Sequence, residues 1–388
     1  MENKTLLLVS NDIELYNKID GLKVFAKLDI QNDFNSVNDY DIVLVSDRLL
    51  SFNNFLDSYR THLKNVKSLF YMVSNHSEHN INHIKAILDA KNVRIIPPRK
   101  TVNQIIEIIL EETGGISLTS KNIAAFFGAD SKTGTTITTQ AIAETLAKGM
   151  HGNVCLMYLN GQPAYDYINF ENSPALGLDN IKVKLINKVL TKNELIDTCV
   201  NKDNLYILTG AEGIAETRHY HPDHVEYLIE LASKHFSALL IDTGCKLQLG
   251  MSIGALNTTN NRYIITTQQD NAKRNFDRTK TQLFSQLGFD VKDFLLIVNK
   301  YIETPELYTP SQLAELYGCT LAGTLPYLDY GWQSERDRNT LLGYSKAYDS
   351  QVEDIAKVIA CQLGLDYTAN ANNESNVIKG AFRWLKKR

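Results

Sequence analysis

Short apolar runs alternate with amphipathic stretches along the first part of the chain. Runs with the length and composition of β-strands lie at 5–10, 23–30, 41–47, 68–74 and 93–98. Helical patterns lie between them, and strands that alternate with helices in this way are typical of a parallel sheet covered by helices. The pattern therefore predicts one α/β domain over residues 1–112.

A second and longer alternating series follows. Its β-like runs lie at 122–128, 153–159, 204–210, 236–242, 262–267, 294–300 and 319–326. These runs, with helical patterns between them, predict one large doubly wound α/β domain over 122–366. The polar, Gly- and Ser-containing segment between the two series predicts a linker over 113–121.

The C-terminal end of the chain has a different composition. Residues 367–376 are polar and predict a flexible linker, and 377–388 read VIKGAFRWLKKR. On a helical projection the apolar side chains of 377–388 gather on one side and most of the basic ones on the other. We expect this tail to make peripheral membrane contact. The alternatives are a solubilising basic tail and a helix that docks on a protein partner.

The overall composition is typical of a globular protein. The 388 residues are 44% hydrophobic and 22% charged, which is ordinary for globular domains. A net charge of −4 provides no overall attraction to nucleic acid. The five cysteines form no CxxC pair, and no apolar run approaches the roughly 20 residues that span a bilayer. We therefore expect a cytoplasmic protein with reduced thiols.

The most informative segment is FFGADSKTGTTITTQ at 126–140, where an apolar strand runs into a small, polar loop and then a helix. In this layout backbone N–H groups and a helix N-terminus can receive a phosphate chain. Gly134 permits close approach of the backbone, and Thr135 and Thr136 place hydroxyls at the helix start. The alternative is an ordinary strand–helix turn rich in small residues.

The loop resembles the deviant Walker A box of MinD, ParA and their relatives, KGGxGKTT. The eight matching positions are Asp130, Ser131, Lys132, Thr133, Gly134, Thr135, Thr136 and Ile137. Asp130 takes the place of the signature lysine and Thr135 that of the P-loop lysine, while Thr136 matches the magnesium-binding threonine. The resemblance implies bound ATP and Mg²⁺, with Lys132 as a partial substitute for the lost lysines.

Later strand ends carry further residues of the same resemblance. Asp242 ends the run ALLID and matches the aspartate that holds magnesium through water. Asn299 and Lys300 follow a late strand, in the place of the asparagine that recognises adenine. Pro326 and Tyr327 lie where relatives pack a Pro-containing loop on the base. The carboxyl ends of parallel strands are where α/β sheets bind ligands, so their order along the chain supports the assignment.

One departure bears on catalysis. Asn160 stands where the family has its water-activating aspartate, and an amide cannot act as a general base. Together with the two missing lysines, three charge-handling groups of phosphoryl transfer are absent. The sequence therefore predicts ATP binding with weak or no hydrolysis.

The organisation of the whole chain resembles the TadZ/CpaE family of pilus-assembly proteins. That resemblance implies a flavodoxin-like, receiver-type domain followed by a doubly wound MinD/ParA-like P-loop NTPase domain. It further implies a homodimeric, ATP-binding scaffold that positions Flp/Tad pilus-assembly components at the cell pole, with a tail similar to the membrane-targeting helix of MinD. Two alternatives stay open: a cycling ParA/MinD-like ATPase for DNA or division-site positioning, and a response regulator whose effector domain binds no nucleotide.

The first domain departs from the residue pattern of true receivers. Asp12 is the only candidate for the acidic pair, and Ser46 stands at the phosphoacceptor position with Asp47 one residue late. Ser74 matches the Ser/Thr position, whereas Pro97 stands where a lysine is expected. We therefore predict a degenerate receiver that serves as a docking or dimerisation module.

Overall fold

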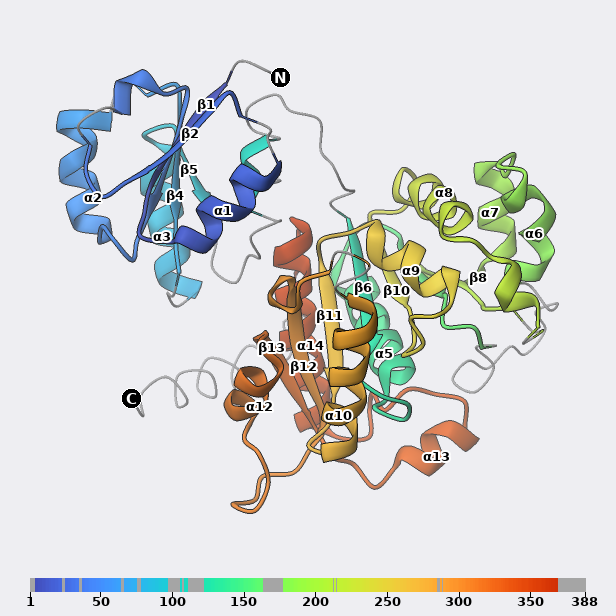
Figure 1. Cartoon of the computed structure of the whole chain (residues 1–388). Helices are drawn as coiled ribbons and strands as arrows, with labels where there is room; N and C mark the ends of the chain where they lie inside the picture. The colour runs from blue at the N-terminus through green and yellow to red at the C-terminus, as the bar shows by residue number, and fades with distance from the viewer. Residues whose placement is uncertain are drawn as a thin grey trace. The chain divides into compact units, whose positions relative to one another are not determined.

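The computed structural model describes residues 4–22, 25–34, 37–63, 66–74, 78–96, 105–106, 108–110, 122–162, 177–211, 213, 215–284, 287 and 289–368. The chain divides into two compact units, residues 1–118 and 119–388 (Figure 1). The division falls within the predicted linker, and both that linker and the predicted tail at 377–388 lie outside the described residues.

The first unit contains a five-stranded parallel sheet with the order β2-β1-β3-β4-β5. This order is that of flavodoxin-like doubly wound folds. The strands are β1 (Thr5–Val9), β2 (Lys27–Gln31), β3 (Ile42–Ser46), β4 (Ser68–Met72) and β5 (Val93–Ile96). The helices with described bounds are α1 (Ile13–Leu22), α2 (Phe52–Ser58) and α3 (Glu78–Asp89).

Both faces of this sheet are covered, which explains why its strands are continuous apolar runs. Leu7, Val43 and Tyr71 pack with Phe55 of α2 and Leu88 of α3 on one face. The alternate residues of the same strands, including Leu6, Leu44 and Phe70, pack with Leu15 and Ile19 of α1 on the other.

The second unit contains an eight-stranded sheet with the order β13-β12-β11-β6-β10-β7-β9-β8. All neighbouring strands are parallel except β8 and β9. The strands are β6 (Ile123–Gly128), β7 (Val154–Tyr158), β8 (Val200–Lys202), β9 (Leu205–Leu208), β10 (Ala238–Asp242), β11 (Arg262–Thr266), β12 (Phe294–Tyr301) and β13 (Thr320–Pro326).

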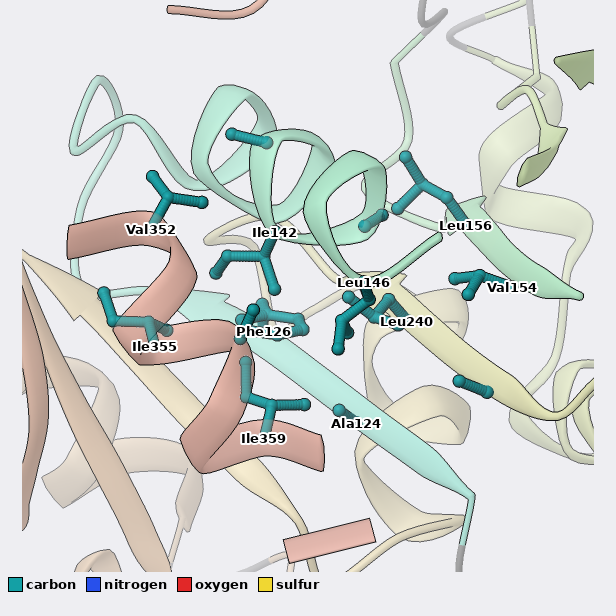
Figure 2. Close-up of a cluster of buried hydrophobic side chains, with 14 of the residues drawn as sticks. Ala124, Phe126, Ile142, Leu146, Val154, Leu156, Leu240, Val352, Ile355 and Ile359 are labelled. Atoms are coloured by element: carbon teal, nitrogen blue, oxygen red, sulfur yellow. The ribbon is translucent and has the colours of Figure 1, made fainter. Parts of the chain in front are cut away.

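Helices cover both faces of this sheet. They are α5 (Thr135–Gly149), α6 (Leu178–Ile186), α7 (Lys192–Thr198), α8 (Pro222–Ser233), α9 (Gly250–Asn257), α10 (Asp270–Thr279), α12 (Pro310–Tyr317), α13 (Gly331–Arg336) and α14 (Lys346–Leu363). One face packs on α5 and α14, where Ile142 and Leu146 meet Phe126, Leu240 and Ile359 (Figure 2). The other face packs on α6 to α10 and α12.

The α/β fold with parallel sheets is confirmed, and each of the seven runs in the second series contains a strand. The apolar pattern does not predict β8, because this three-residue edge strand is mostly exposed and shows no apolar alternation. Packed structure also continues past residue 366. Thr368 donates its backbone N–H to the Gly149 carbonyl at 2.9 Å, so the assignment of 367 and 368 to a flexible linker is replaced by a contact with the end of α5.

The contact between β13 and α14 gives a test of this packing. A Cβ built on Gly323 lies 2.5 Å from Cγ1 of Ile355, so we expect Gly323→Ala to lower the free energy of unfolding. The expected loss is about 2 kcal/mol, measured by urea denaturation of the full chain. Gly331→Ala is the matched control, because nothing lies within 4 Å of its added Cβ. An unfolding midpoint for Gly323→Ala equal to that of the control would contradict this account.

Candidate functional site

The loop from Ala129 to Gly134 lies at the carboxyl end of β6, between the ends of β10 and β11. The base of the loop is fixed by both neighbours. Gly128 donates its N–H to the Gly244 carbonyl at 2.8 Å, and Ala129 donates to the Ile265 carbonyl at 2.9 Å. A Cβ on Gly128 would lie 2.4 Å from Oγ1 of Thr135, so the turn into α5 requires glycine there.

The backbone of the loop is shaped to leave the helix N-terminus open. Lys132 and Gly134 have positive φ values of 63° and 86°. Gly134 is the N-cap residue of α5, and no side chain caps the helix. The first N–H groups of a helix have no intrahelical partners, so an uncapped N-terminus reached through such a loop is suited to an anion such as phosphate.

Thr135 and Asp130, which stand where the deviant Walker A motif has lysines, have local structural roles. Thr135 is buried, and its Oγ1 lies 3.2 Å from that of Thr133, which in turn donates to the Asp130 carbonyl at 3.0 Å. The Asp130 carboxylate accepts the Ser131 N–H at 2.7 Å. Ile137 is partly buried on the first turn of α5, where its Cγ2 lies 3.7 Å from a Cβ built on Gly134.

A polar cluster joins the start of α5 to the ends of β7 and β10. Thr136 Oγ1 donates to Asp242 Oδ2 at 2.7 Å, and Asn160 Nδ2 donates to the same oxygen at 2.7 Å. Gly244 donates its N–H to Asp242 Oδ1 at 2.9 Å. The sequence-predicted pair Thr136 and Asp242 is therefore in direct contact, and Asn160 lies against both.

The electrostatics of this cluster favour a cation. Asp242 is completely buried, and burial raises the pKa of its carboxyl although the three hydrogen bonds act in the opposite direction. The three described donors to the Asp242 carboxylate are all neutral groups. They therefore compensate only part of the cost of burying its negative charge. One carboxylate and one hydroxyl fit magnesium, which usually takes one or two carboxylates and completes its shell with water and phosphate oxygens.

Asn299 and Lys300 reach the same loop from the end of β12. The register of β12 against β13 shifts between Val298 and Tyr301. Asn299 Nδ2 donates to the Thr133 carbonyl and Lys300 Nζ to the Lys132 carbonyl, each at 2.9 Å. A Cβ on Gly134 would lie 2.3 Å from Asn299 Nδ2, so glycine is required for this contact.

A cavity of about 930 Å³ opens beside the loop. It is lined by Lys132, Thr267, Gln268, Gln269, Asp270, Asn271, Arg274, Lys300, Ile302, Pro305, Glu306, Leu307, Tyr308, Gln312 and Tyr327. Tyr327 is half exposed and donates its N–H to the Tyr301 carbonyl at 2.9 Å. Pro326, in contrast, pairs with Tyr301 within the sheet and is not among the lining residues.

Gln268 also lines this wall and was not among the predicted site residues. Its Nε2 donates to the carbonyls of Ile302 and Tyr308 at 3.0 and 2.9 Å, and its Oε1 accepts the Ile302 N–H at 2.8 Å. These bonds hold the 302–308 loop against the end of β11. Its position directly after the strand run 262–267, at the ligand-binding edge of the sheet, is the signal that could have found it.

In the first unit the structure brings together only some of the receiver positions. Asp47 accepts hydrogen bonds from the Ser74 N–H at 2.8 Å and the Ser74 hydroxyl at 2.6 Å. Asp12 instead accepts the Leu15 N–H at 3.0 Å at the start of α1, and Ser46 is buried. Pro97 lies outside the described residues.

The contact between Asn160 and Asp242 generates a prediction. Asn160→Asp places two carboxylates at hydrogen-bonding distance, where both cannot ionise without cost. We expect a loss of about 1–3 kcal/mol of stability at neutral pH without magnesium, because of this repulsion. Millimolar Mg²⁺ should raise the melting temperature of this variant more than that of the wild type.

Asn201→Asp on the exposed edge strand β8 makes the same chemical change away from the site and is the control. Melting curves with and without Mg²⁺ provide the measurement. If Asn160→Asp melts like Asn201→Asp under both conditions, the two carboxylates do not share a cation site.

Several solved structures of other proteins are similar in fold to this chain. A ParA family ATPase from Chlorobium tepidum TLS matches with a TM-score of 0.54 and 16% identity, over 61% of this chain and 99% of that one. MinD from Pyrococcus horikoshii, complexed with Mg-ADP, matches with a TM-score of 0.50 and 15% identity, over 61% of this chain and 94% of that one. The cell division ATPase MinD from Pyrococcus furiosus matches with a TM-score of 0.50 and 16% identity, over 62% of this chain and 99% of that one.

No protein-family model matches the sequence, and no curated relative does. A structural match over 61% of the chain is longer than the 118 residues of the first unit, so it must extend over the second. At 15–16% sequence identity, structural similarity establishes a shared fold. The second unit has the α/β fold of the ParA and MinD P-loop ATPases.

Proposed function

We propose that the chain is an ATP- and magnesium-binding positioning protein that hydrolyses ATP slowly or not at all. The observation that carries this proposal is the cluster of Thr136, Asp242 and Asn160 beside an uncapped helix N-terminus. The structurally similar Pyrococcus horikoshii MinD is complexed with Mg-ADP, which supports a nucleotide and magnesium as the ligands.

In this proposal the loop N–H groups and the N-terminus of α5 hold the phosphate chain. When Mg²⁺ is bound, the Thr136 hydroxyl and the Asp242 carboxylate would be the groups that hold it. The ion supplies positive charge to the phosphate oxygens. Because Asp242 is buried, the attraction between its carboxylate and the ion is strong, since a low-dielectric environment screens charges less than water does.

The same residues explain why turnover should be slow. A lysine ammonium about 4 Å from a phosphate contributes about 4 kcal/mol at an effective dielectric near 20, and Thr135 lacks that charge. Asn160 presents an amide where a base is needed, and its Nδ2 is already bonded to Asp242. The loop is therefore suited to binding a nucleotide and poorly suited to cleaving it.

The finer assignment rests on the TadZ/CpaE resemblance. We propose a homodimeric scaffold that positions pilus-assembly components at the cell pole, with the first unit as the docking or dimerisation module. Asp130 in place of the signature lysine shifts the dimer contact to other surfaces. None of the described helices is long and apolar enough to cross a membrane. The basic tail at 377–388 is proposed to provide peripheral contact on the cytoplasmic face.

Calorimetry on nucleotide-stripped protein tests the proposal, with ATP and ADP titrated in the presence and absence of magnesium. We expect Thr136→Val to weaken magnesium-dependent ATP binding at least about tenfold, because it removes a metal-binding hydroxyl without changing the shape of the side chain. Phosphate release, followed in parallel, should be negligible in both proteins.

Thr138→Val is the matched control on the same helix. The Thr138 hydroxyl is buried and has no hydrogen-bond partner in the described structure, so its loss should leave ATP binding unchanged. Absence of ATP binding by the wild type would refute the nucleotide proposal. Rapid magnesium-dependent phosphate release would instead identify a cycling ATPase.

A further inference from the structure

We propose that Lys246, in the segment 243–249 between β10 and α9, binds the terminal phosphate of ATP and so makes the site prefer ATP to ADP. The inference rests on the proposed nucleotide site and adds to it a residue outside the loop after β6. Its evidence is the position of the segment against that loop, the exposure of Lys246 and the distribution of charge around Thr136 and Asp242.

The start of the segment is fastened to β6 by backbone and side-chain hydrogen bonds. Thr243 donates its N–H and its hydroxyl to the Phe126 carbonyl, at 3.0 and 2.9 Å. Gly244 accepts the Gly128 N–H at 2.8 Å and has a φ of 65°. A Cβ on Gly244 would lie 2.8 Å from Cβ of Asn160, so this close approach requires glycine. The backbone at the start of the segment is therefore fixed beside the base of the loop after β6.

The two neighbours of Lys246 keep it at the same place. Leu247 is buried in the hydrophobic layer that also contains Ala129 of the loop after β6. Burial raises the pKa of the Cys245 thiol, and the nearby Asp130 carboxylate acts in the same direction. Lys246 is thus held between one neighbour that packs in the same layer as the loop and another that lies near the loop's carboxylate.

The ammonium group of Lys246 is available for a ligand. The side chain is exposed, and within the described part of the chain no hydrogen bond or ion pair holds its ammonium. It belongs to the one basic residue of the segment, which reads TGCKLQL. A lysine on its flexible four-carbon stem binds phosphate as a compact point charge. The segment therefore brings one unpaired cation to the edge of the sheet where the nucleotide is proposed to bind.

The charges on the two sides of the loop after β6 differ. Towards β12, Lys132 lines the cavity and Lys300 donates to the Lys132 carbonyl at 2.9 Å. Towards β10, Asp242 adds a buried negative charge, and Mg²⁺ held by Thr136 and Asp242 offsets it. Magnesium in such sites contacts the terminal phosphates of the nucleotide. A further cation on the β10 side therefore meets the terminal phosphate and not the base.

Lys246 also compensates for a charge that the loop itself lacks. Thr135 stands where the deviant Walker A motif has its P-loop lysine, and its hydroxyl is buried within the turn beside that of Thr133. A cation from the neighbouring segment restores part of the attraction for phosphate from a different direction. Because ADP has no third phosphate on the magnesium side, this attraction favours ATP.

Calorimetry with Mg-ATP and Mg-ADP on nucleotide-stripped, full-length protein tests the inference. Lys246→Met removes the charge and keeps most of the stem. We expect it to weaken Mg-ATP binding about tenfold, the usual effect of losing one hydrogen bond to a charged group, and Mg-ADP binding less than about threefold. Lys246→Arg keeps the charge, and its affinity for Mg-ATP should stay within about threefold of the wild type.

The salt dependence of Mg-ATP binding is a second readout. Loss of one charge that faces the ligand should make binding by Lys246→Met less sensitive to ionic strength than binding by the wild type. Lys148→Met, exposed near the carboxyl end of α5, is the matched control and should bind both nucleotides like the wild type. Melting temperatures without nucleotide should be equal for all variants, because the Lys246 ammonium has no partner in the described structure.

Several results would overturn the inference. Lys246→Met could bind Mg-ATP like Lys148→Met, or lose equal affinity for Mg-ATP and Mg-ADP, and either result would separate Lys246 from the terminal phosphate. A lower melting temperature of nucleotide-free Lys246→Met would make Lys246 a structural residue. A loss in Lys246→Arg as large as that in Lys246→Met would show that charge is not the cause. Failure of the wild type to bind either nucleotide is a different outcome, because it refutes the proposed function itself.

Discussion

The buried carboxylate of Asp242 is the constraint around which the ligand-binding edge of the second unit is arranged. It ends β10, which lies between β6 and β7, so the loop after β6 and the residue that follows β7 both come within reach. Thr136 and Asn160 use that proximity to solvate the carboxylate with neutral donors. Such donors offset only part of the cost of burying a charge, which leaves an attraction for a cation at this point.

The core explains why this edge can hold such a cluster in place. All six residues of β6 are buried, and its alternate side chains enter the hydrophobic layers on the two faces of the sheet. The strand that carries the loop from Ala129 to Gly134 is thus fixed from both sides and by hydrogen bonds to β10 and β11. The cavity wall is held by hydrogen bonds and not by core packing. The Gln268 side chain makes three hydrogen bonds with the backbone of the 302–308 loop. A loop fixed by strand pairing and packing therefore adjoins a cavity wall built from a tethered loop.

Sequence alone could predict the α/β fold because the fold depends on simple patterns, and the same patterns indicate where a ligand is expected. Strands buried on two faces must be continuous apolar runs, so β6, β10 and β12 stand out, and ligands of such sheets gather at the carboxyl ends. The contacts between side chains could not be obtained in this way. The direction of Lys300 depends on a register shift that no residue pattern marks. The three bonds of Gln268 depend on the path of a loop, and the burial of Thr135 depends on how tightly the turn after Gly128 closes.

Asn160 shows how the identity of one side chain determines what holds this cluster together. An aspartate in its place would put a second negative charge beside Asp242, and the pair would need a cation or a proton to remain together. The amide instead donates to Asp242 while its Oδ1 accepts the Gln162 N–H at 2.9 Å, so it joins the segment after β7 to the end of β10 without any ion. The amide therefore stabilises the ion-free form of this cluster.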